Sequence, residues 1–135
     1  MSGLKLETCT DRAEYGAGEE ILARVLLFNL DEDPVTVNSR LALGPPDGPG
    51  EVHFSVRGPS GGELPFAARV NLGLPDEEDF TEVVPWNCVG RQYELRTYYQ
   101  FDEPGRYELR ATYRTDAPHA WAGVLHADPT TFTVH

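Results

Sequence analysis

Two histidines and two aspartates lie close together near the end of the chain. His119 and His126 are seven residues apart, and Asp116 and Asp128 flank them. Imidazole and carboxylate groups bind zinc and act in acid–base catalysis. However, residues seven apart in a connection have no fixed spatial relation, and the pattern lacks the H-x-x-x-H spacing of a helical metal site. We therefore expect solvated histidines, no metal and no cofactor.

Residues 58–62 read Gly-Pro-Ser-Gly-Gly and match the G-x-S-x-G pattern of serine hydrolases. That pattern presents a nucleophile only on a sharp strand-to-helix turn of a parallel α/β sheet, and no helix-forming stretch follows it here. We expect Ser60 to lie in an ordinary turn. Since no nucleophile, base and oxyanion donor converge, an enzyme is the weakest interpretation of the sequence and we predict no catalytic residues.

Acidic residues gather in two runs, at residues 31–33 and 76–79. Calcium requires several converging oxygen atoms, and neither run has the alternating acidic spacing of a calcium loop. Acidic turns are normally solvated. In a binding module, Asp31 and Asp33 would instead contribute to the surface that meets a partner.

Trp86 and Trp121 admit two interpretations. Each can cap the open end of a hydrophobic core, or it can anchor a partner, because aromatic side chains dominate binding hot spots. Trp121, His119 and His126 all belong to residues 115–129, and connections this long are uncommon in small domains and often functional. The connection supports the binding interpretation more than Trp121 does alone.

The elements that must position these residues read as short strands. Residues 89–95 and 106–113 alternate apolar with polar side chains and are joined by a turn that holds Pro104 and Gly105. They predict two consecutive antiparallel strands. One face of the second strand should be buried, and it consists of Tyr107, Leu109, Ala111 and Tyr113.

The rest of the chain shows the same pattern of short runs separated by Gly, Pro and Asp turns. Residues 75–79 can form a single helical turn or a solvated loop. Without a helical period, the pattern predicts an all-β fold, a single antiparallel two-sheet sandwich of seven to nine strands over residues 1–135. Further strands are expected at residues 4–9, 21–28, 35–41, 52–57 and 131–134, with residues 64–70 pairing back as a hairpin.

Charge and composition limit the classes of partner that this chain can bind. The net charge is −11 and the isoelectric point about 4.6, so nucleic acid and anionic membranes are unfavourable partners. The chain begins without a basic, apolar leader, which predicts a cytoplasmic location. Cys9 and Cys88 are the only cysteines; two reduced thiols are the favoured interpretation, and a disulfide between them stays open.

Several motifs together resemble a known group of proteins. They are Tyr15-x-x-Gly18-Glu19, the apolar run that ends at Asn29, and Pro104-Gly105-x-Tyr107. The chain resembles small bacterial immunoglobulin-like domains, among them the intracellular proteinase inhibitor family of bacilli and the non-catalytic β-sandwich module of deuterolysin-type metalloproteases. The resemblance covers most of the chain and specifies a fold better than a function.

The resemblance assigns a role to Tyr107. In immunoglobulin-like sandwiches a tyrosine at the start of the penultimate strand bonds the backbone of the preceding corner. The inter-sheet disulfide of antibody domains is absent, since Leu109 stands at its second position. The chain also departs from related modules at one turn, where Pro85 is followed by Trp86 instead of glycine.

These observations leave three hypotheses about function. The first is a module that binds another protein through its end loops, in its sharpest form a protease inhibitor, as the resemblance implies. The second is a structural or accessory domain that associates through an exposed sheet edge near residues 4–6. The third is a metal-dependent enzyme. For the first, the expected binding residues are Trp121, His119, His126, Trp86, Asp31 and Asp33.

Overall fold

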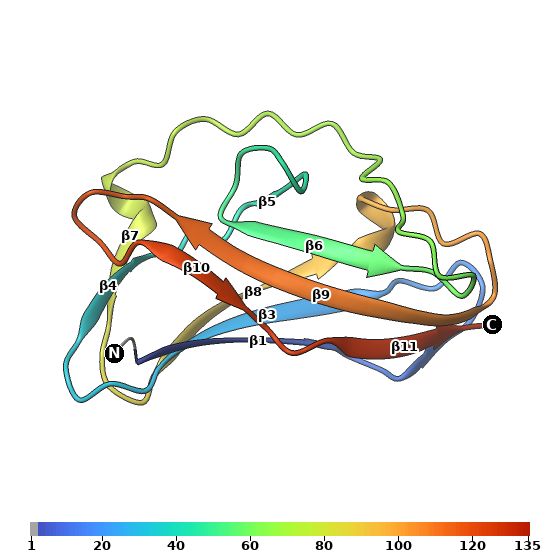
Figure 1. Cartoon of the computed structure of the whole chain (residues 1–135), viewed down its shortest axis with the longest axis horizontal. Coiled ribbons are helices and arrows are strands. Elements are labelled where there is room, and N and C mark those ends of the chain that lie inside the picture. The colour runs from blue at the N-terminus through green and yellow to red at the C-terminus, as the bar shows by residue number, and fades with distance from the viewer. Residues whose placement is uncertain (1–2) are drawn as a thin grey trace.

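Short strands make up most of the regular structure in residues 3–135, the part of the chain that the computed structural model describes (Figure 1). That part contains eleven strands, two more than the upper end of the predicted range, and two 3-10 turns. The strands are β1 (Leu4–Thr10), β2 (Glu14–Tyr15), β3 (Leu22–Asn29), β4 (Val35–Asn38), β5 (Leu43–Gly44), β6 (Val52–Arg57), β7 (Phe80–Val83), β8 (Cys88–Glu94), β9 (Gly105–Thr115), β10 (Gly123–His126) and β11 (Thr130–Val134); the turns are η1 (Glu77–Asp79) and η2 (Leu95–Thr97).

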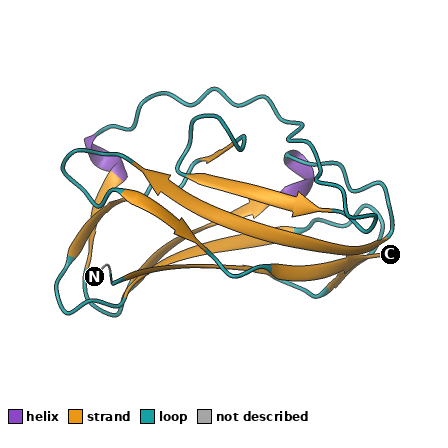
Figure 2. Cartoon of the chain, in the orientation of Figure 1, coloured by secondary structure: helices purple, strands orange, loops and turns teal. Residues whose placement is uncertain are grey.

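The strands form three sheets (Figure 2). One has the order β1-β3-β8, and a larger one has the order β2-β11-β9-β6-β5, with β10 beside β9. These two share one hydrophobic core; for example, the rings of Phe54 in β6 and Tyr93 in β8 meet edge to face at 5.3 Å. The third sheet, β4-β7, closes one end. Most pairings are antiparallel, but β2–β11 and β5–β6 are parallel.

The predicted buried face of β9 is confirmed, whereas its predicted neighbour is wrong. Tyr107, Leu109, Ala111 and Tyr113 are each at most 2% exposed. However, β8 pairs with β3, and β9 pairs with β6, β10 and β11 in the other sheet. Alternation shows which face of a strand is buried, but two facing sheets present the same pattern, so it does not identify the hydrogen-bonded neighbour.

The corner before β9 is held by Tyr107, as the resemblance implies. The Tyr107 hydroxyl donates to the carbonyl oxygen of Glu103, four residues earlier. Gly105 has a φ of 137°, and a Cβ there would lie 2.7 Å from the ring of Pro59. Only glycine combines this φ with such a close approach, which explains the Pro104-Gly105-x-Tyr107 pattern.

One third of the expected connection at residues 115–129 is strand: Thr115 ends β9, and residues 123–126 form β10. β10 pairs with β9 from Gly123 opposite Thr115 to His126 opposite Thr112. The loop between β9 and β10 is therefore residues 116–122, and residues 127–129 link β10 to β11. The prediction missed β10 because its four residues are too few to show a period, and their exposure alternates only between exposed and half-buried.

Two other predicted strands differ. The run at residues 35–41 ends at Asn38, whose side chain accepts from the N–H of Arg40, and Leu41 then takes a positive φ of 50°. The predicted hairpin at residues 64–70 does not form. It stops at a single bridge between Arg57 and Glu63, since Pro65 has no N–H to continue the ladder.

The alternation in residues 52–57 predicts that His53 lies on the polar face of its strand, whereas the structure buries it. Its Nδ1 lies 2.8 Å from the carbonyl oxygen of Pro45, and its Nε2 lies 2.9 Å from that of Gly50. The proline-rich loop between β5 and β6 thus folds over this side chain.

Among residues 3–135, no helix has the length and apolar character needed to cross a membrane.

Candidate functional site

Three segments come together at the end of the molecule that carries the β4-β7 sheet, at the left of Figure 1. We call residues 30–39, 74–87 and 115–122 the β4–β7 end. The pairing of β4 with β7 joins the first two segments, and the N–H of Trp121 donates to the carbonyl oxygen of Thr36 at 2.8 Å, which joins the third. This end gathers five of the six residues predicted to bind a partner.

A fully buried asparagine fixes the loops of this end. The Asn29 amide nitrogen donates to the carbonyl oxygens of Asp33 and Val83, both at 2.9 Å. Its side-chain oxygen accepts from the N–H of Asp31 at 2.8 Å. One side chain therefore shapes the acidic loop after β3 and ties it to the end of β7. Buried polar side chains are normally hydrogen-bonded in this way.

Trp86 sits at the third position of a tight turn. The N–H of Asn87 donates to the carbonyl oxygen of Val84 at 3.2 Å and closes a four-residue turn. Pro85 fixes a negative φ at the second position, and Trp86 has a φ of 67° at the third. This combination defines a type II turn, whose third position favours glycine or asparagine. A large aromatic residue is rare in this conformation.

The side chain of Trp86 is 71% exposed, although tryptophan is normally well buried. Leu30 and Val84 are 43% and 47% exposed in the same two loops. The N–H of Trp86 donates to the carbonyl oxygen of Asn29 at 2.7 Å, so the two loops are held side by side. We call Leu30, Val84 and Trp86 the Trp86 patch. It is an apolar surface on a rigid support.

The segments that carry the Trp86 patch also carry carboxylates. Asp31 is half-buried, and one of its side-chain oxygens accepts from the N–H of Glu32 at 2.7 Å. The side chains of Asp33 and Glu82 are exposed. The structure therefore brings Asp31, Asp33 and Trp86 together, which the sequence could not establish because they lie in separate connections.

Trp121 and His119 lie in the loop between β9 and β10. The Trp121 ring packs against Tyr113 at 5.8 Å and is half-buried, so it covers the open end of the core. His119 is exposed and borders a shallow hollow that Pro118, Phe80, Pro75, Asp76 and Glu77 also line. Of the two tryptophans, Trp86 offers much the larger free surface.

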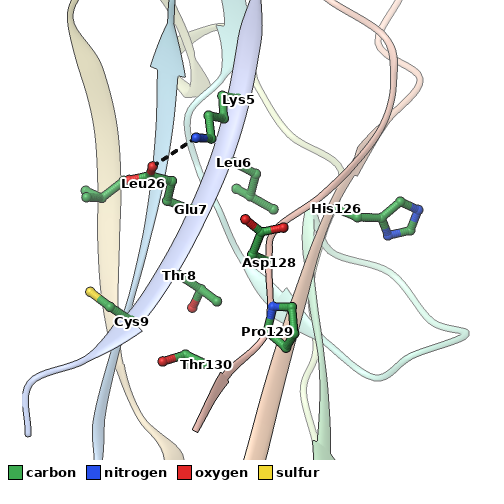
Figure 3. Close-up of a pocket in the computed structure, with 10 residues that line it drawn as sticks. All are labelled: Lys5, Leu6, Glu7, Thr8, Cys9, Leu26, His126, Asp128, Pro129 and Thr130. Atoms are coloured by element: carbon green, nitrogen blue, oxygen red, sulfur yellow. Dashed lines mark ion pairs between the residues drawn. The ribbon is translucent and has the colours of Figure 1, made fainter. Parts of the chain in front are cut away.

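His126 lies apart from the other five predicted residues. It is exposed at the end of β10, where its Nδ1 lies 3.2 Å from the hydroxyl of Thr112. Figure 3 shows the pocket between β1 and the chain that enters β11, with the His126 ring directed away from it. Lys5 and Glu7 form an ion pair of 3.4 Å on β1 there. His119 and His126 therefore do not form a shared site.

A second network supports the β4–β7 end from within. Arg40 and Glu51 form a two-bond ion pair with distances of 2.6 and 2.9 Å, and the Arg40 Nη1 donates to the carbonyl oxygen of Gly73 at 2.8 Å. The hydrogen bonds to Glu51 raise the pKa of Arg40 above its ordinary value. The Glu51 carboxylate also accepts from the N–H of Ala42 at 3.0 Å. This network holds the start of the segment that leads into η1.

The remaining candidate groups do not converge. Within residues 3–135, no set of three or more His, Cys, Asp or Glu side chains is placed to hold a metal ion. Cys9 and Cys88 are exposed and unbridged, and they lie on strands that flank β3 on opposite sides. Ser60 lies in the turn after β6, as predicted.

The chain matches no protein-family model, and no curated protein matches it significantly, so the comparisons add no support for either family that it resembles.

Proposed function

We propose that this chain is an immunoglobulin-like module that binds another protein through its β4–β7 end. The observation that carries the proposal is the Trp86 indole, which is largely exposed on a turn fixed by Asn29. Exposed tryptophans on rigid supports are the residues most enriched among binding hot spots, because they contribute a large area at little cost in conformational entropy.

The order of the strands supports the immunoglobulin-like class. In such domains the first, second and fifth strands share one sheet, and the third, sixth and seventh share the other. Here β1, β3 and β8 share one sheet, whereas β6, β9 and β11 share the other. The Tyr107 corner has the expected place at the start of β9. In antibody variable domains, loops at one end of this framework bind the antigen, an analogy that favours the β4–β7 end.

Affinity capture tests the proposal. The intact chain, a Trp86→Gly variant and a Trp121→Ala variant would each be immobilised and exposed to lysate of the source cell. We expect a protein retained by the intact chain and lost with Trp86→Gly. A control with His126→Ala, which lies outside the β4–β7 end, should capture normally. If the Trp86→Gly and Trp121→Ala variants both retained the same protein as the intact chain, the proposal would be contradicted.

Protease inhibition is the sharpest form of the proposal. In this form the turn at residues 84–87 would occupy a substrate cleft without being cut, because Pro85 and the Asn29 contacts hold it in one conformation. The purified chain should then slow cleavage of a reporter substrate by a neutral or metallo-protease. Complete digestion of the chain with no slowing of the reporter would exclude this form while leaving other protein partners open.

A sheet edge offers a second candidate function. β1 pairs with β3 on one side and is the outer strand of its sheet. Such an edge can accept a strand from a partner. A Lys5→Pro substitution should then abolish association, whereas Trp86→Gly should leave it intact. This outcome is the opposite of the one that we expect for the first candidate.

A further inference from the structure

We propose that the partner presents a basic segment, in which a lysine or arginine lies next to an apolar side chain, to the Trp86 patch. This inference rests on the proposed function, because it names the chemistry of the partner that the β4–β7 end would bind. It draws on two observations, the exposed apolar group of the patch and the distribution of charge around it.

The charge of the β4–β7 end is entirely of one sign at neutral pH. Residues 30–39, 74–87 and 115–122 contain nine carboxylates and neither lysine nor arginine. Two arginines border these segments. Arg40 pairs with Glu51 and also interacts with the carboxylates of Asp76 and Asp79, and the Arg114 guanidinium lies 3.2 Å from His53. They offset part of the negative charge on the side of η1. The field here attracts cationic segments and repels acidic ones, which sets both the rate of encounter and the choice of partner.

The indole of Trp86 fits the same partner. Tryptophan is the best aromatic face for a guanidinium or ammonium group, and the carboxylates of Asp31 and Asp33 lie in the adjoining loop. Leu30 and Val84 add exposed aliphatic surface on the same two hydrogen-bonded loops. A cation alone would leave that surface in water. A basic residue with an apolar neighbour would cover both parts of the patch.

Two other occupants are disfavoured by the same charges. A second copy of this chain that used the patch in a two-fold dimer would bring nine carboxylates against nine identical ones. Nucleic acid and anionic lipid would meet the same repulsion. A basic segment of a different protein is the occupant that the charges favour.

Peptide selection tests the inference directly. A phage-displayed library of random dodecapeptides would be panned on the intact chain, and the enriched sequences would be synthesised and measured by calorimetry or fluorescence. We expect enriched peptides with several lysine or arginine residues and an adjacent apolar side chain. Their affinity should fall about tenfold or more with Trp86→Gly, and by about tenfold with the triple variant Asp31→Asn, Glu32→Gln, Asp33→Asn.

A charge-matched control separates local from overall electrostatics. The triple variant Glu20→Gln, Asp102→Asn, Asp128→Asn removes the same charge from exposed positions outside the β4–β7 end. It should change the affinity less than about twofold. An equal loss in both triple variants would overturn the inference, since attraction by the net charge would then explain the binding.

The outcomes distinguish this inference from the proposed function. Neutral or acidic peptides whose binding depends on Trp86 would overturn the basic partner and leave the β4–β7 end as the binding site. Basic peptides that bind the Trp86→Gly variant equally well would overturn both. If no peptide were enriched above background, the inference of a basic segment would be overturned. Lysate capture would still decide whether the β4–β7 end binds a protein.

Discussion

The N–H of Trp86 donates to the carbonyl oxygen of Asn29 at 2.7 Å. This bond joins the turn before β8 to the loop after β3, and it sets the most exposed aromatic side chain of the described chain beside an acidic loop. The buried Asn29 side chain holds both loops from below. The candidate binding surface is therefore positioned by the framework of the sheet rather than by contacts within the surface itself.

Replacing Trp86 with glycine should stabilise the fold. A residue with a Cβ in the left-handed region costs about 1–2 kcal/mol, and the exposed indole contributes little burial in return. We expect the free energy of unfolding to rise by about 1 kcal/mol after the entropy of glycine is included. Urea denaturation monitored by circular dichroism measures the change.

The control for this substitution is alanine at the same position. Trp86→Ala removes the indole but keeps a Cβ at the positive φ, so it should leave the stability nearly unchanged. If Trp86→Ala and Trp86→Gly gave the same stability, the conformation of the turn would not be the cause.

Truncating Asn29 should destabilise the domain and loosen both loops. Asn29→Ala leaves the buried carbonyl of Val83 without this donor and removes the bonds to residues 31 and 33. We expect a loss of about 3 kcal/mol, because unsatisfied buried polar groups cost about 1–3 kcal/mol each. Asn87→Ala is the matched control, since the Asn87 side chain is exposed and donates to the carbonyl oxygen of Pro85, two residues earlier. Equal losses in the two variants would contradict the role of Asn29.

The Tyr107 corner should contribute measurably to stability. Tyr107→Phe removes the hydroxyl that donates to Glu103 and retains the buried ring stacked on Phe132. The expected loss is about 0.5–1.5 kcal/mol, the range for one intramolecular hydrogen bond. Tyr98→Phe, at a half-buried ring that packs on Phe66, serves as the comparison and should cost less. Chemical denaturation of both variants would decide.

Buried tyrosines should make the domain sensitive to alkali. Burial raises the phenol pKa of Tyr93, Tyr99 and Tyr113 above the ordinary value. Above about pH 10 the unfolded chain loses phenol protons that the folded chain keeps. The unfolded state then binds fewer protons, so stability falls as the pH rises, whereas these groups have no effect at neutral pH.

Tyrosinate absorbance and circular dichroism, followed together through an alkaline titration, test this expectation. The ionisation of Tyr93, Tyr99 and Tyr113 should coincide with loss of structure. Ionisation of all six tyrosines in a domain that stays folded would contradict it.

The sequence predicted the faces of the strands better than their neighbours. The alternation in residues 106–113 correctly identified the buried side of β9, because burial depends on the local period. The placement of β8 in the opposite sheet depends on long-range pairing with β3, which no local pattern encodes. His53 was misplaced for a similar reason, since its burial depends on the folding of residues 45–50 over it.

The candidate surface was predictable only in parts. Asp31, Asp33 and Trp86 were each singled out, but their proximity depends on hydrogen bonds across 54 residues of sequence, from Asn29 to Val83. Asn29 itself carried a weak signal, as a polar residue that ends an apolar strand before an acidic turn. The departure from glycine at Trp86 was visible in the sequence, but its positive φ was not.

The turn at residues 84–87 also bears on how this chain would change under selection. Glycine or asparagine suits the third position of that turn better than tryptophan does. A laboratory evolution experiment that rewards only heat resistance should therefore replace Trp86 early, within its first rounds. An experiment that rewards only capture of the partner should keep tryptophan there and repair the stability elsewhere in the domain.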